Sequence, residues 1–525
     1  MKIWGNSGGR TESRKAPPPP EPKPQRPSPP VRPPSPGRPG AARPSSQEPF
    51  EIDWEAVWRR EEEARRRQAA ARRQAEARSQ AEQIPEFVVK AQTNRSPGPR
   101  RQAPPPNPKG GKPKKKKKRH WFRNLLLTVL LLTGLYCVAV FSNIPFIAKW
   151  RTIYIETAMS TMTHQWLATA FIPPSVIEQV EGNREKQENE QLTLESNWNN
   201  LQTPSFDFGQ AELSPWEKLK DEFFQNYPEI QQQSFEDYME EHQDEAIDEN
   251  GYLTIDQAGL DQEGTDIETI HGDQVLAVDT ANGLTICKVT GEGYVGRLAI
   301  IKNPAQVGVA LAPGYGSVGG QAADIAEKRD AVLLTNASGF YDPEGHGNGG
   351  VAHGLVVSGG KRHNGAVGGT YKTVGLDGEN RLHVGPYKKG ADYRDAVEFK
   401  PALIIDGQQA VEGSAGWGVQ PRTAIGQTSD GTILLLVVDG RAPGYSIGCT
   451  VGDCAEILGR YGAVQACNLD GGSSSIMVYN GRVISRPSAA NKTDGRHIPN
   501  GIAVYRRDNA SNGAGGTQDD ETIGE

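Results

Sequence analysis

The C-terminal half of the chain alternates short apolar runs with turn residues. From about Gln274 onward, runs such as VLAVDT, AVLLTNASGF, ALIIDG, TILLLVVDG and VQACNLDGG end at Gly, Asn, Asp or Pro. β-Branched runs of this length that end in turn residues are typical of strands. Two helices are predicted among them, over 321–329 and over 453–461, the second with Thr450 as its cap. The pattern predicts an α+β domain over residues 273–507, with a mixed twisted β-sheet and few helices.

A long uncharged run lies far upstream of these strands. Residues 125–141 read LLLTVLLLTGLYCVAVF, and the apolar character continues to Ile147. A bilayer crossing needs about 20 mostly apolar residues, so residues 121–147 are predicted to form a single transmembrane helix. The basic block KPKKKKKRH and Trp121 precede the run, which predicts a cytoplasmic N-terminus and an extracytoplasmic C-terminal part. A cleaved signal peptide would begin closer to Met1.

The regions on the two sides of this span differ in charge. Residues 1–120 carry 29 Lys and Arg against 12 Asp and Glu, a net of +17, and the remainder carries 29 against 52, a net of −23, which together give −6. Residues 1–120 are rich in Pro, Lys and Arg and are predicted to be disordered, with a charged helix at about 47–83. The lysine block is explained by membrane insertion, so no nucleic-acid partner is predicted. A cytoplasmic partner of the proline-rich tract stays open.

The segment between the span and the strands is acidic and glutamine-rich. Residues 148–272 are predicted to form an extracytoplasmic helical stalk or linker, and 508–525 a disordered tail. The first part of the 148–272 segment, residues 151–173, has apolar periodicity, but Arg151 and Glu156 argue against a second membrane crossing. An amphipathic helix close to the outer membrane face is predicted there.

Four of the five cysteines follow the predicted span. Cys137 lies inside it, whereas Cys287, Cys449, Cys454 and Cys467 lie where disulfides can persist. Four cysteines allow three pairings, and the sequence does not choose among them. Free thiols stay an alternative, and the C-x-x-C spacing of a zinc site is missing.

Charged residues stand where apolar runs of the last third end in glycine turns. Arg422 opens PRTAIG, Asp439 and Arg441 follow ILLLVV, and Asp470 precedes GGSSS. The planar fork of arginine binds phosphate oxygens bidentately, and the N–H groups of a Gly/Ser turn form an anion-binding nest. The combination predicts an enzyme that acts on a phosphorylated substrate.

The stretch from Asp273 to Arg507 resembles the phosphodiester glycosidase family, which includes the uncovering enzymes. The resemblance rests on TNASGFYDPEGHGNGG, PRTAIG, VVDGR, CNLDGGSSS and GRHIPNG. The matched positions are Asn336, Gly339, Phe340, Arg422, Thr423, Asp439, Gly440, Arg441, Asn468, Asp470, Gly471, Gly472, Ser474, Arg496 and Asn500. Many family members carry a third glycine where this chain has Ser473, which still allows a tight turn.

The resemblance implies hydrolysis of the anomeric C–O bond of a sugar 1-phosphodiester, with release of free sugar and a phosphate monoester. Asp470 and Asp439 would act as base, nucleophile or stabiliser of an oxocarbenium ion, and their separation would decide between inversion and retention. The expected substrate- and phosphate-binding residues are Arg422, Arg441, Arg496, Asn336, Asn468, Thr423, Gly471, Gly472, Ser473 and Ser474. No cofactor is predicted to be required, a structural Ca²⁺ stays an alternative, and the metal question stays open because His346, His353 and His363 are loosely spaced.

Together these observations predict a membrane-anchored bacterial hydrolase that acts on a cell-surface or exopolysaccharide glycan. Three alternatives stay open. A glycan phosphotransferase would use the same cationic clamp but would need an acceptor pocket. A non-catalytic glycan-phosphate binding module would keep the arginines and tolerate loss of Asp439 or Asp470. In the third alternative, the N-terminal region has the main role, as a cytoplasmic scaffold.

Overall fold

The computed structural model describes residues 119–161, 164–201, 215–342 and 347–507. The chain divides into two compact units, 1–75 and 76–525, and every described residue belongs to the second. Residues 1–118, with the predicted charged helix, and the predicted tail at 508–525 lie outside the described residues.

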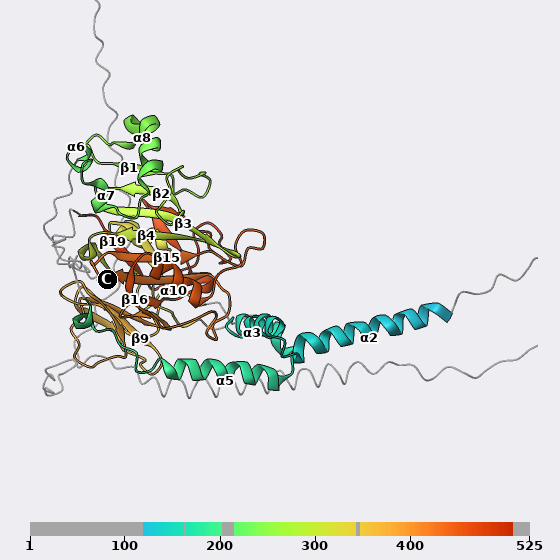
Figure 1. Cartoon of the computed structure of the whole chain (residues 1–525). Helices are drawn as coiled ribbons and strands as arrows, with labels where there is room; N and C mark the ends of the chain where they lie inside the picture. Colours follow the sequence, from blue (N-terminus) through green and yellow to red (C-terminus); the bar gives the residue numbers. More distant parts are fainter. Residues whose placement is uncertain (1–118, 162–163, 202–214, 343–346, 508–525) are drawn as a thin grey trace, which may run out of the picture. The chain divides into compact units, whose positions relative to one another are not determined.

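Four helices come first in the described chain (Figure 1). They are α2 (Arg119–Phe141), α3 (Pro145–Met159), α4 (Trp166–Thr169) and α5 (Pro174–Glu190). The segment Trp121–Phe141 of α2 has a mean hydropathy of 2.2, and only 6% of its most apolar window is buried. By length and composition α2 can therefore cross a membrane. One apolar cluster joins the end of α2 to the other three helices: Val140, Ile155, Ala158, Ala168, Ile172, Ile177 and Val180.

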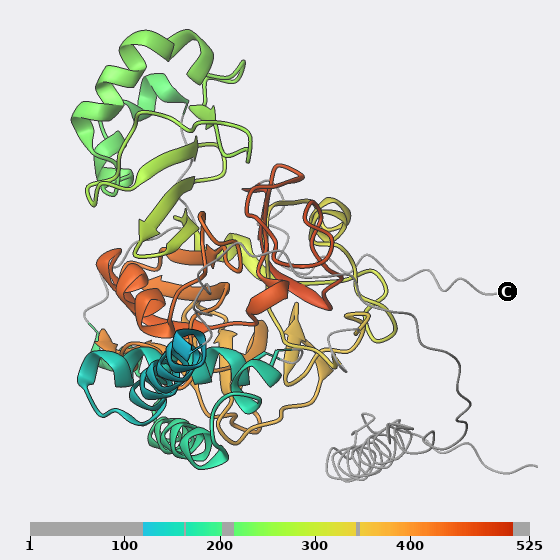
Figure 2. The same cartoon turned by 90° about the vertical axis from the view of Figure 1, so that its right-hand side faces the viewer.

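A small helical unit follows (Figure 2). It consists of α6 (Trp216–Leu219), α7 (Phe223–Asn226), α8 (Gln232–Ala246) and β1 (Thr254–Asp256). Phe223 stacks on Phe235 with ring centroids 4.4 Å apart, and both side chains are buried. These rings pack in one cluster with Val275 and Val278 of β2, so the unit is fixed to the first long strands of the domain.

The strands of the described chain form three antiparallel sheets. The nine-stranded sheet has the order β1-β2-β3-β4-β15-β14-β16-β12-β13, and the five-stranded sheets have the orders β10-β9-β11-β7-β8 and β18-β17-β6-β19-β5. The bounds are β2 (Gln274–Asp279), β3 (Leu284–Gly291), β4 (Tyr294–Ile301), β5 (Val307–Leu311), β6 (Ala331–Asn336), β7 (Val356–Ser358), β8 (Lys361–Asn364), β9 (Lys372–Leu376), β10 (Leu382–Gly385), β11 (Asp395–Phe399), β12 (Ala402–Ile405), β13 (Gln408–Gln409), β14 (Arg422–Thr428), β15 (Ile433–Val438), β16 (Ala463–Asn468), β17 (Met477–Tyr479), β18 (Arg482–Val483) and β19 (Asn500–Tyr505). The predicted α+β class with few helices in the C-terminal domain is confirmed.

The uninterrupted apolar run of β15 reflects a strand that is covered on both faces. Alternate residues of a strand point to opposite sides of the sheet. Leu435 and Val437 belong to one core cluster, whereas Leu434 and Leu436 belong to a second one. All six residues of β15 are buried, which places this strand at the centre of the domain.

Two helices lie among the strands, as the sequence predicts. They are α9 (Ala322–Lys328) and α10 (Val451–Arg460). The Thr450 hydroxyl accepts from the Asp453 N–H at 3.1 Å, and the Asp453 carboxylate accepts from the Thr450 N–H at 2.7 Å. This reciprocal cap fixes the start of α10.

The chain that follows α5 joins the sheet domain. The Gln191 side chain donates to Ala402 O at 3.1 Å and accepts from Ala402 N at 3.1 Å, and the Trp198 indole donates to Leu382 O at 3.0 Å. Ser196 N–H donates to Val384 O at 2.9 Å. Residues 191–198, within the predicted stalk or linker, are therefore bonded directly to β10 and β12.

Two buried cysteines lie next to each other at the start of α10. Cys449 Sγ and Cys454 Sγ are 3.4 Å apart, and both are free thiols. A small rotation of either side chain would bring the sulfurs to the bonding distance of about 2.05 Å. In an oxidising compartment we expect this pair to form a disulfide and Cys287 and Cys467 to remain thiols. Intact-mass and peptide mapping of the full chain without reductant would check this, with Cys454→Ser as control. Recovery of both thiols alkylated after oxidation would contradict it.

Candidate active site

Three strand ends meet at one edge of the nine-stranded sheet. β14 begins at Arg422, opposite Val438 at the end of β15. On its other side, Ala424 of β14 lies opposite Asn468 at the end of β16. Because both pairs are antiparallel, the start of β14 lies at the same edge as the ends of β15 and β16. The turns 439–441 and 470–474 therefore leave the sheet from neighbouring positions.

The sheet containing β6 contributes to the same edge. Asn336, the last residue of β6, donates from Nδ2 to Asp470 O at 2.6 Å. Asp470 N–H in turn donates to Ala337 O at 3.0 Å. These two bonds fix the backbone of the 470–474 turn between two sheets.

Asp470 is the acidic residue of this turn, and the pKa of its carboxyl group is raised. Burial raises the pKa of Asp470 to about 6, and the nearby Asp342 carboxylate adds to the rise. The Ser474 hydroxyl, the Arg496 charge and the Gly471 N–H act in the opposite direction. Since the reference pKa of aspartate is about 3.9, this carboxyl group changes charge close to neutral pH. A group with that property is suited to proton transfer or to nucleophilic attack.

Arg496 lies on one side of the turn. Its Nη1 donates to Asp342 Oδ2 at 2.7 Å and to Ser473 Oγ at 3.1 Å. Its guanidinium carbon lies 4.5 Å from the centroid of the Phe340 ring. Ser473, which stands where many family members have a third glycine, thus accepts a hydrogen bond from Arg496, one of the three arginines predicted to bind phosphate.

Arg441 also lies beside the turn and is exposed. Its Nη2 donates to Gln420 Oε1 at 3.3 Å, and a Cβ on Gly472 would lie 3.0 Å from the same nitrogen. Among the described residues, no carboxylate forms an ion pair with Arg441 within 4.0 Å. Its backbone has a φ of 56°, in the left-handed region that costs a non-glycine residue about 1 kcal/mol or more. The strained backbone holds a cation that is available to a ligand.

Arg422, the other predicted clamp residue, has a different environment. The residue is 3% exposed, and its guanidinium donates to Trp417 O at 2.8 Å, Gly418 O at 2.9 Å and Cys449 O at 3.4 Å. Its hydrogen bonds to the Trp417 and Gly418 carbonyl groups hold the loop 413–420. The geometry favours a positioning role beneath the site.

Both carboxylate oxygens of Asp439 accept hydrogen bonds from other residues of the protein. Its Oδ2 accepts from Arg297 Nη1 at 2.5 Å and from the Tyr445 hydroxyl at 2.9 Å, and its Oδ1 accepts from Arg486 N–H at 2.7 Å. Burial raises the pKa of Asp439 and the Arg297 charge opposes this rise. The carboxylate is 2% exposed, so this environment favours a structural ion pair.

The predicted polar residues of the strand ends mostly bond to one another. Asn336 Oδ1 accepts from Thr423 Oγ1 at 2.7 Å and from Ile476 N–H at 3.1 Å. Asn468 donates to Lys400 O at 3.0 Å, while its buried Oδ1 has no hydrogen-bond partner among the described residues. Gly471 is required where it stands, because a Cβ there would lie 2.9 Å from Pro421 O. Of this group, Asn468 Oδ1 retains an acceptor for a ligand or water.

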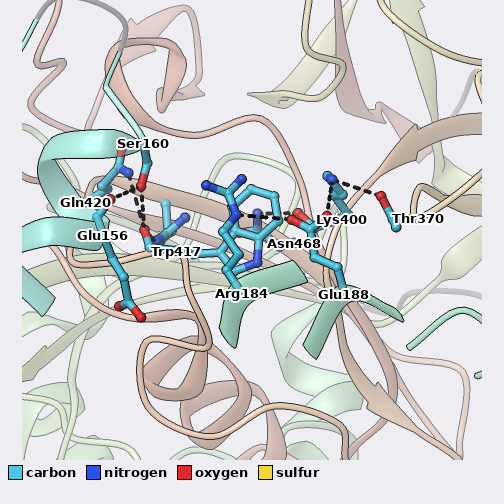
Figure 3. Close-up of polar contacts among 10 residues, drawn as sticks. Glu156, Ser160, Arg184, Glu188, Thr370, Lys400, Trp417, Gln420 and Asn468 are labelled. Atoms are coloured by element: carbon cyan, nitrogen blue, oxygen red, sulfur yellow. Dashed lines mark hydrogen bonds and ion pairs between the residues drawn. The ribbon is translucent and has the colours of Figure 1, made fainter. Parts of the chain in front are cut away.

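Two residues outside the predicted set, Tyr371 and Lys400, link the region of the turn to Glu188 of α5, and Figure 3 shows Lys400 beside Glu188. Burial raises the pKa of Tyr371 to about 12, and the Asp470 carboxylate contributes to the rise, which places this phenol near the turn. Lys400 Nζ lies 5.0 Å from the centroid of the Tyr371 ring and forms an ion pair with Glu188 of α5 at 2.8 Å. A cavity of about 200 Å³ lies beside this pair, lined in part by Glu188, Gln191, Thr370, Lys400 and Trp417. The cavity is lined by residues of α5, of loop 413–420 and of the chain around Lys400, and no residue of the 470–474 turn is among its lining residues.

Comparison with known proteins finds a family match over the same part of the chain. The family model described as phosphodiester glycosidase matches residues 329–505, which include β6, β14, β15, β16 and the 470–474 turn. Residues 329–505 therefore match the phosphodiester glycosidase family. The match begins after β4, so Arg297, the partner of Asp439, lies outside the matched part of the glycosidase domain.

Curated relatives share short segments with this chain. The SPbeta prophage-derived uncharacterized protein YomE of Bacillus subtilis is 36% identical over 104 residues, 19% of this chain and 16% of its own length. The N-acetylglucosamine-1-phosphodiester alpha-N-acetylglucosaminidase of Bos taurus is 40% identical over 70 residues, 13% of each chain. The chain thus spans less than a fifth of the length of these relatives. A solved zebrafish catalytic domain with the same enzyme name, auto-inhibited by its pro-peptide, is 18% identical with a TM-score of 0.35, over 43% of this chain and 82% of that chain.

The residues that sequence reasoning missed are distant from the glycosidase motifs along the chain. Tyr371, Lys400 and Glu188 carry no local signal that marks them as part of a site. Asp342, in contrast, stands in the quoted YDPEG stretch, two residues after the matched Phe340. An acidic residue so close to a matched aromatic could have been noted as a partner for Arg496.

Within the described residues, no group of three or more His, Cys, Asp or Glu side chains is arranged to hold a metal ion. His346, one of the three loosely spaced histidines, lies outside the described residues. The alternative of a structural Ca²⁺ therefore gains no candidate ligand set from the described part of the chain.

Proposed function

We propose that the glycosidase domain hydrolyses the anomeric C–O bond of a sugar 1-phosphodiester, and that its substrate is a cell-surface or exopolysaccharide glycan. The observation that carries the proposal is that two arginines lie close to the turn that begins at Asp470. A Cβ on Gly472 would lie 3.0 Å from Arg441 Nη2, and Ser473 Oγ accepts from Arg496 Nη1 at 3.1 Å. A carboxyl group with a pKa of about 6, on a turn that two cations approach, suits a reaction whose leaving group is a phosphate monoester.

In the proposed reaction the oxygen of water bonds to the anomeric carbon. The bond from that carbon to the phosphate oxygen breaks, and its electron pair leaves with the phosphate monoester. Asp470 takes a proton from the attacking water if it acts as base. If it acts as nucleophile, its oxygen bonds to the anomeric carbon first and water hydrolyses the resulting ester. The anomer of the released sugar, read by NMR before mutarotation, separates the two routes.

Arg441 is the proposed principal phosphate ligand, and Arg496 with Ser473 is proposed to bind a second phosphate oxygen. A phosphate placed between them would share its charge with both guanidinium groups. The N–H groups and hydroxyls of the 471–474 turn are proposed to bind the remaining oxygens. Asn468 Oδ1 is an acceptor suited to a sugar hydroxyl.

The proposed setting follows from the apolar helix. α2 is proposed to be a single-pass membrane anchor, with the basic block on the cytoplasmic side and the glycosidase domain on the other. Labelling of an introduced surface cysteine in intact cells with a membrane-impermeant reagent tests this orientation. Labelling only after cell lysis would place the domain in the cytoplasm.

The direct test of activity uses the full chain in detergent. It is incubated with UDP-N-acetylglucosamine or a sugar 1-(methyl phosphate), and the products are identified by mass spectrometry. Free sugar with a phosphate monoester supports the proposal. Sugar 1-phosphate would show cleavage at phosphorus, and transfer of a sugar phosphate to an added acceptor would favour the phosphotransferase. Binding without turnover across a panel of sugars would favour the binding module.

Replacement of Arg441 by alanine is expected to lower kcat/KM by about 10²–10³-fold, because one charge-assisted contact to the reacting phosphate is removed. The melting temperature should stay close to that of the parent, since Arg441 has no carboxylate partner among the described residues. Arg381→Ala, which removes an exposed arginine paired with Glu379, is the matched control and should change neither quantity. An unchanged kcat/KM in Arg441→Ala would remove this residue from the phosphate site.

A further inference from the structure

The helices after α2 pack beside the last turns of that helix. The Tyr136 hydroxyl donates to Phe171 O, just after α4, at 2.8 Å. Tyr136 lies five residues before the end of α2, which corresponds to about 7.5 Å of helix. Arg151 of α3 donates to Val140 O and Ser142 O at 2.8 and 2.9 Å. Where α2 crosses a bilayer, α3 and α4 are therefore held at the level of the bilayer surface.

These two short helices expose large aromatic side chains at that level. Phe146 is 72% exposed, Trp150 48% and Tyr154 43%, and the spacing of four residues places all three on one face of α3. Trp166 and Phe171, in and just after α4, are 55% and 58% exposed. So many exposed aromatic side chains are unusual on a surface that meets water alone. Tryptophan and tyrosine are enriched where a protein meets lipid headgroups.

α3 and α5 contact the loop 413–420 of the glycosidase domain (Figure 3). In the last turn of α3, the Thr157 hydroxyl accepts from Val419 N–H at 2.9 Å. In α5 the Arg184 guanidinium lies 4.6 Å from the centroid of the Trp417 ring. A Cβ on Gly418 would lie 2.5 Å from Thr157 N, so the loop and α3 are in close contact.

This loop leads directly to the candidate site. Gln420, its last residue, accepts the hydrogen bond from Arg441. Arg184 lies ten residues after Pro174, about 15 Å along α5. The phosphate-binding arginine is thus connected, through one loop, to helices held beside the end of α2.

We propose that α3 and α4 rest in the headgroup layer on the domain's side of the bilayer, and that this seat presents the site to sugar phosphodiesters that are themselves linked to membrane lipid. The occupant of the aromatic face is lipid because the face continues from α2, which the bilayer already surrounds. The statement about substrate rests on the proposed function, whereas the statement about the headgroup layer does not.

The depth of the aromatic face is measured in vesicles that contain the full chain. A Cys137→Ser background removes the exposed thiol of α2, and the other four cysteines are buried. Phe146→Cys and Phe171→Cys are labelled with a small fluorophore in phosphatidylcholine vesicles that carry bromine at a shallow or a deep acyl position. Glu240→Cys, at an exposed position of α8, is the matched control.

Shallow bromines are expected to remove most of the fluorescence at positions 146 and 171 and none at 240. Labels at 146 and 171 that behave like the label at 240 would overturn the proposed seat. Stronger quenching by deep bromines would also overturn it, because the face would then lie in the hydrocarbon core.

The substrate statement is tested in the same vesicles. The ratio of hydrolysis rates is measured for a lipid-linked sugar phosphodiester and for a water-soluble analogue with the same sugar. The double variant Phe146→Ser and Trp150→Ser should lower the rate for the lipid-linked compound and leave that for the soluble one unchanged. Ile270→Ser, which replaces an apolar residue that is 58% exposed elsewhere, should change neither rate.

The two proposals fail in different ways. Equal loss for both compounds, or no loss for either, in the double variant would overturn the substrate statement. Absence of hydrolysis of both compounds by the parent, with shallow quenching retained, would reject the proposed function and leave the headgroup seat supported.

Discussion

Replacement of Asp470 by asparagine is expected to lower the turnover of a sugar 1-phosphodiester by about 10²–10⁴-fold. The change removes the charge of the carboxylate and keeps the size of the side chain. The backbone bonds of Asp470 to Asn336 and Ala337 do not depend on the side chain, so the 470–474 turn should keep its conformation. Single-turnover release of free sugar measures the effect. Activity close to that of the parent would remove Asp470 from the chemistry.

The raised pKa of Asp470 predicts two dependences on pH. If ionised Asp470 is the base or nucleophile, kcat/KM should rise with pH through about 6 and then level off. A fall above pH 6 would instead assign it the role of a proton donor.

The free energy of unfolding should change with pH in the opposite direction. Between about pH 3.9, where the unfolded-state aspartate titrates, and about 6, the folded state binds more protons, so ionised Asp470 lowers the free energy of unfolding as pH rises. Asp470→Asn should lack this decrease.

The sequence predicted the position of the 470–474 turn because its signal is local. A buried strand, an aspartate and two glycines in succession specify a tight turn at the end of a strand. The antiparallel order of β15, β14 and β16 then brings two such turns to one edge. That step requires only the strand assignments and their pairing, and it explains why residues that the sequence grouped together lie at neighbouring strand ends.

The different environments of Arg422 and Arg441 could not be predicted in the same way. Both stand beside a strand end, and both match the family pattern. The difference arises because loop 413–420 folds over Arg422, which supplies donors to its carbonyl groups, and leaves Arg441 exposed. Asp439 is a similar case, since its partner Arg297 lies 142 residues earlier, on β4. Burial that depends on distant segments leaves no local pattern.

The contacts of residues 148–201 are likewise long-range. The polar composition of this segment and its separation from the strand pattern predicted a stalk or linker. Gln191 bonds to Ala402, 211 residues away, and Trp198 bonds to Leu382, 184 residues away. Neither contact can be inferred from helical periodicity. A single buried glutamine or tryptophan in a polar segment is a weak signal that becomes meaningful only with the structure.

Replacement of Arg422 by alanine is expected to lower the free energy of unfolding by about 3–5 kcal/mol. The substitution removes the guanidinium group that donates to the carbonyl groups of Trp417, Gly418 and Cys449, and it opens a cavity beneath loop 413–420. Arg422→Lys should recover little of the loss, because a single ammonium group does not reproduce the planar fork that reaches all three oxygens. Urea unfolding of the detergent-solubilised full chain, followed by near-UV circular dichroism, measures the change.

The comparison with Arg441→Ala decides between the two roles that the sequence left combined. If Arg422 positions the loop, its loss should lower stability strongly, and activity should fall because Gln420 no longer holds Arg441. Arg441→Ala should lower activity alone. If instead Arg422 binds phosphate directly, Arg422→Ala should keep the stability of the parent and raise KM for the phosphodiester. That result would return Arg422 to the cationic clamp and leave loop 413–420 to be held by α3 and α5, through Thr157 and Arg184.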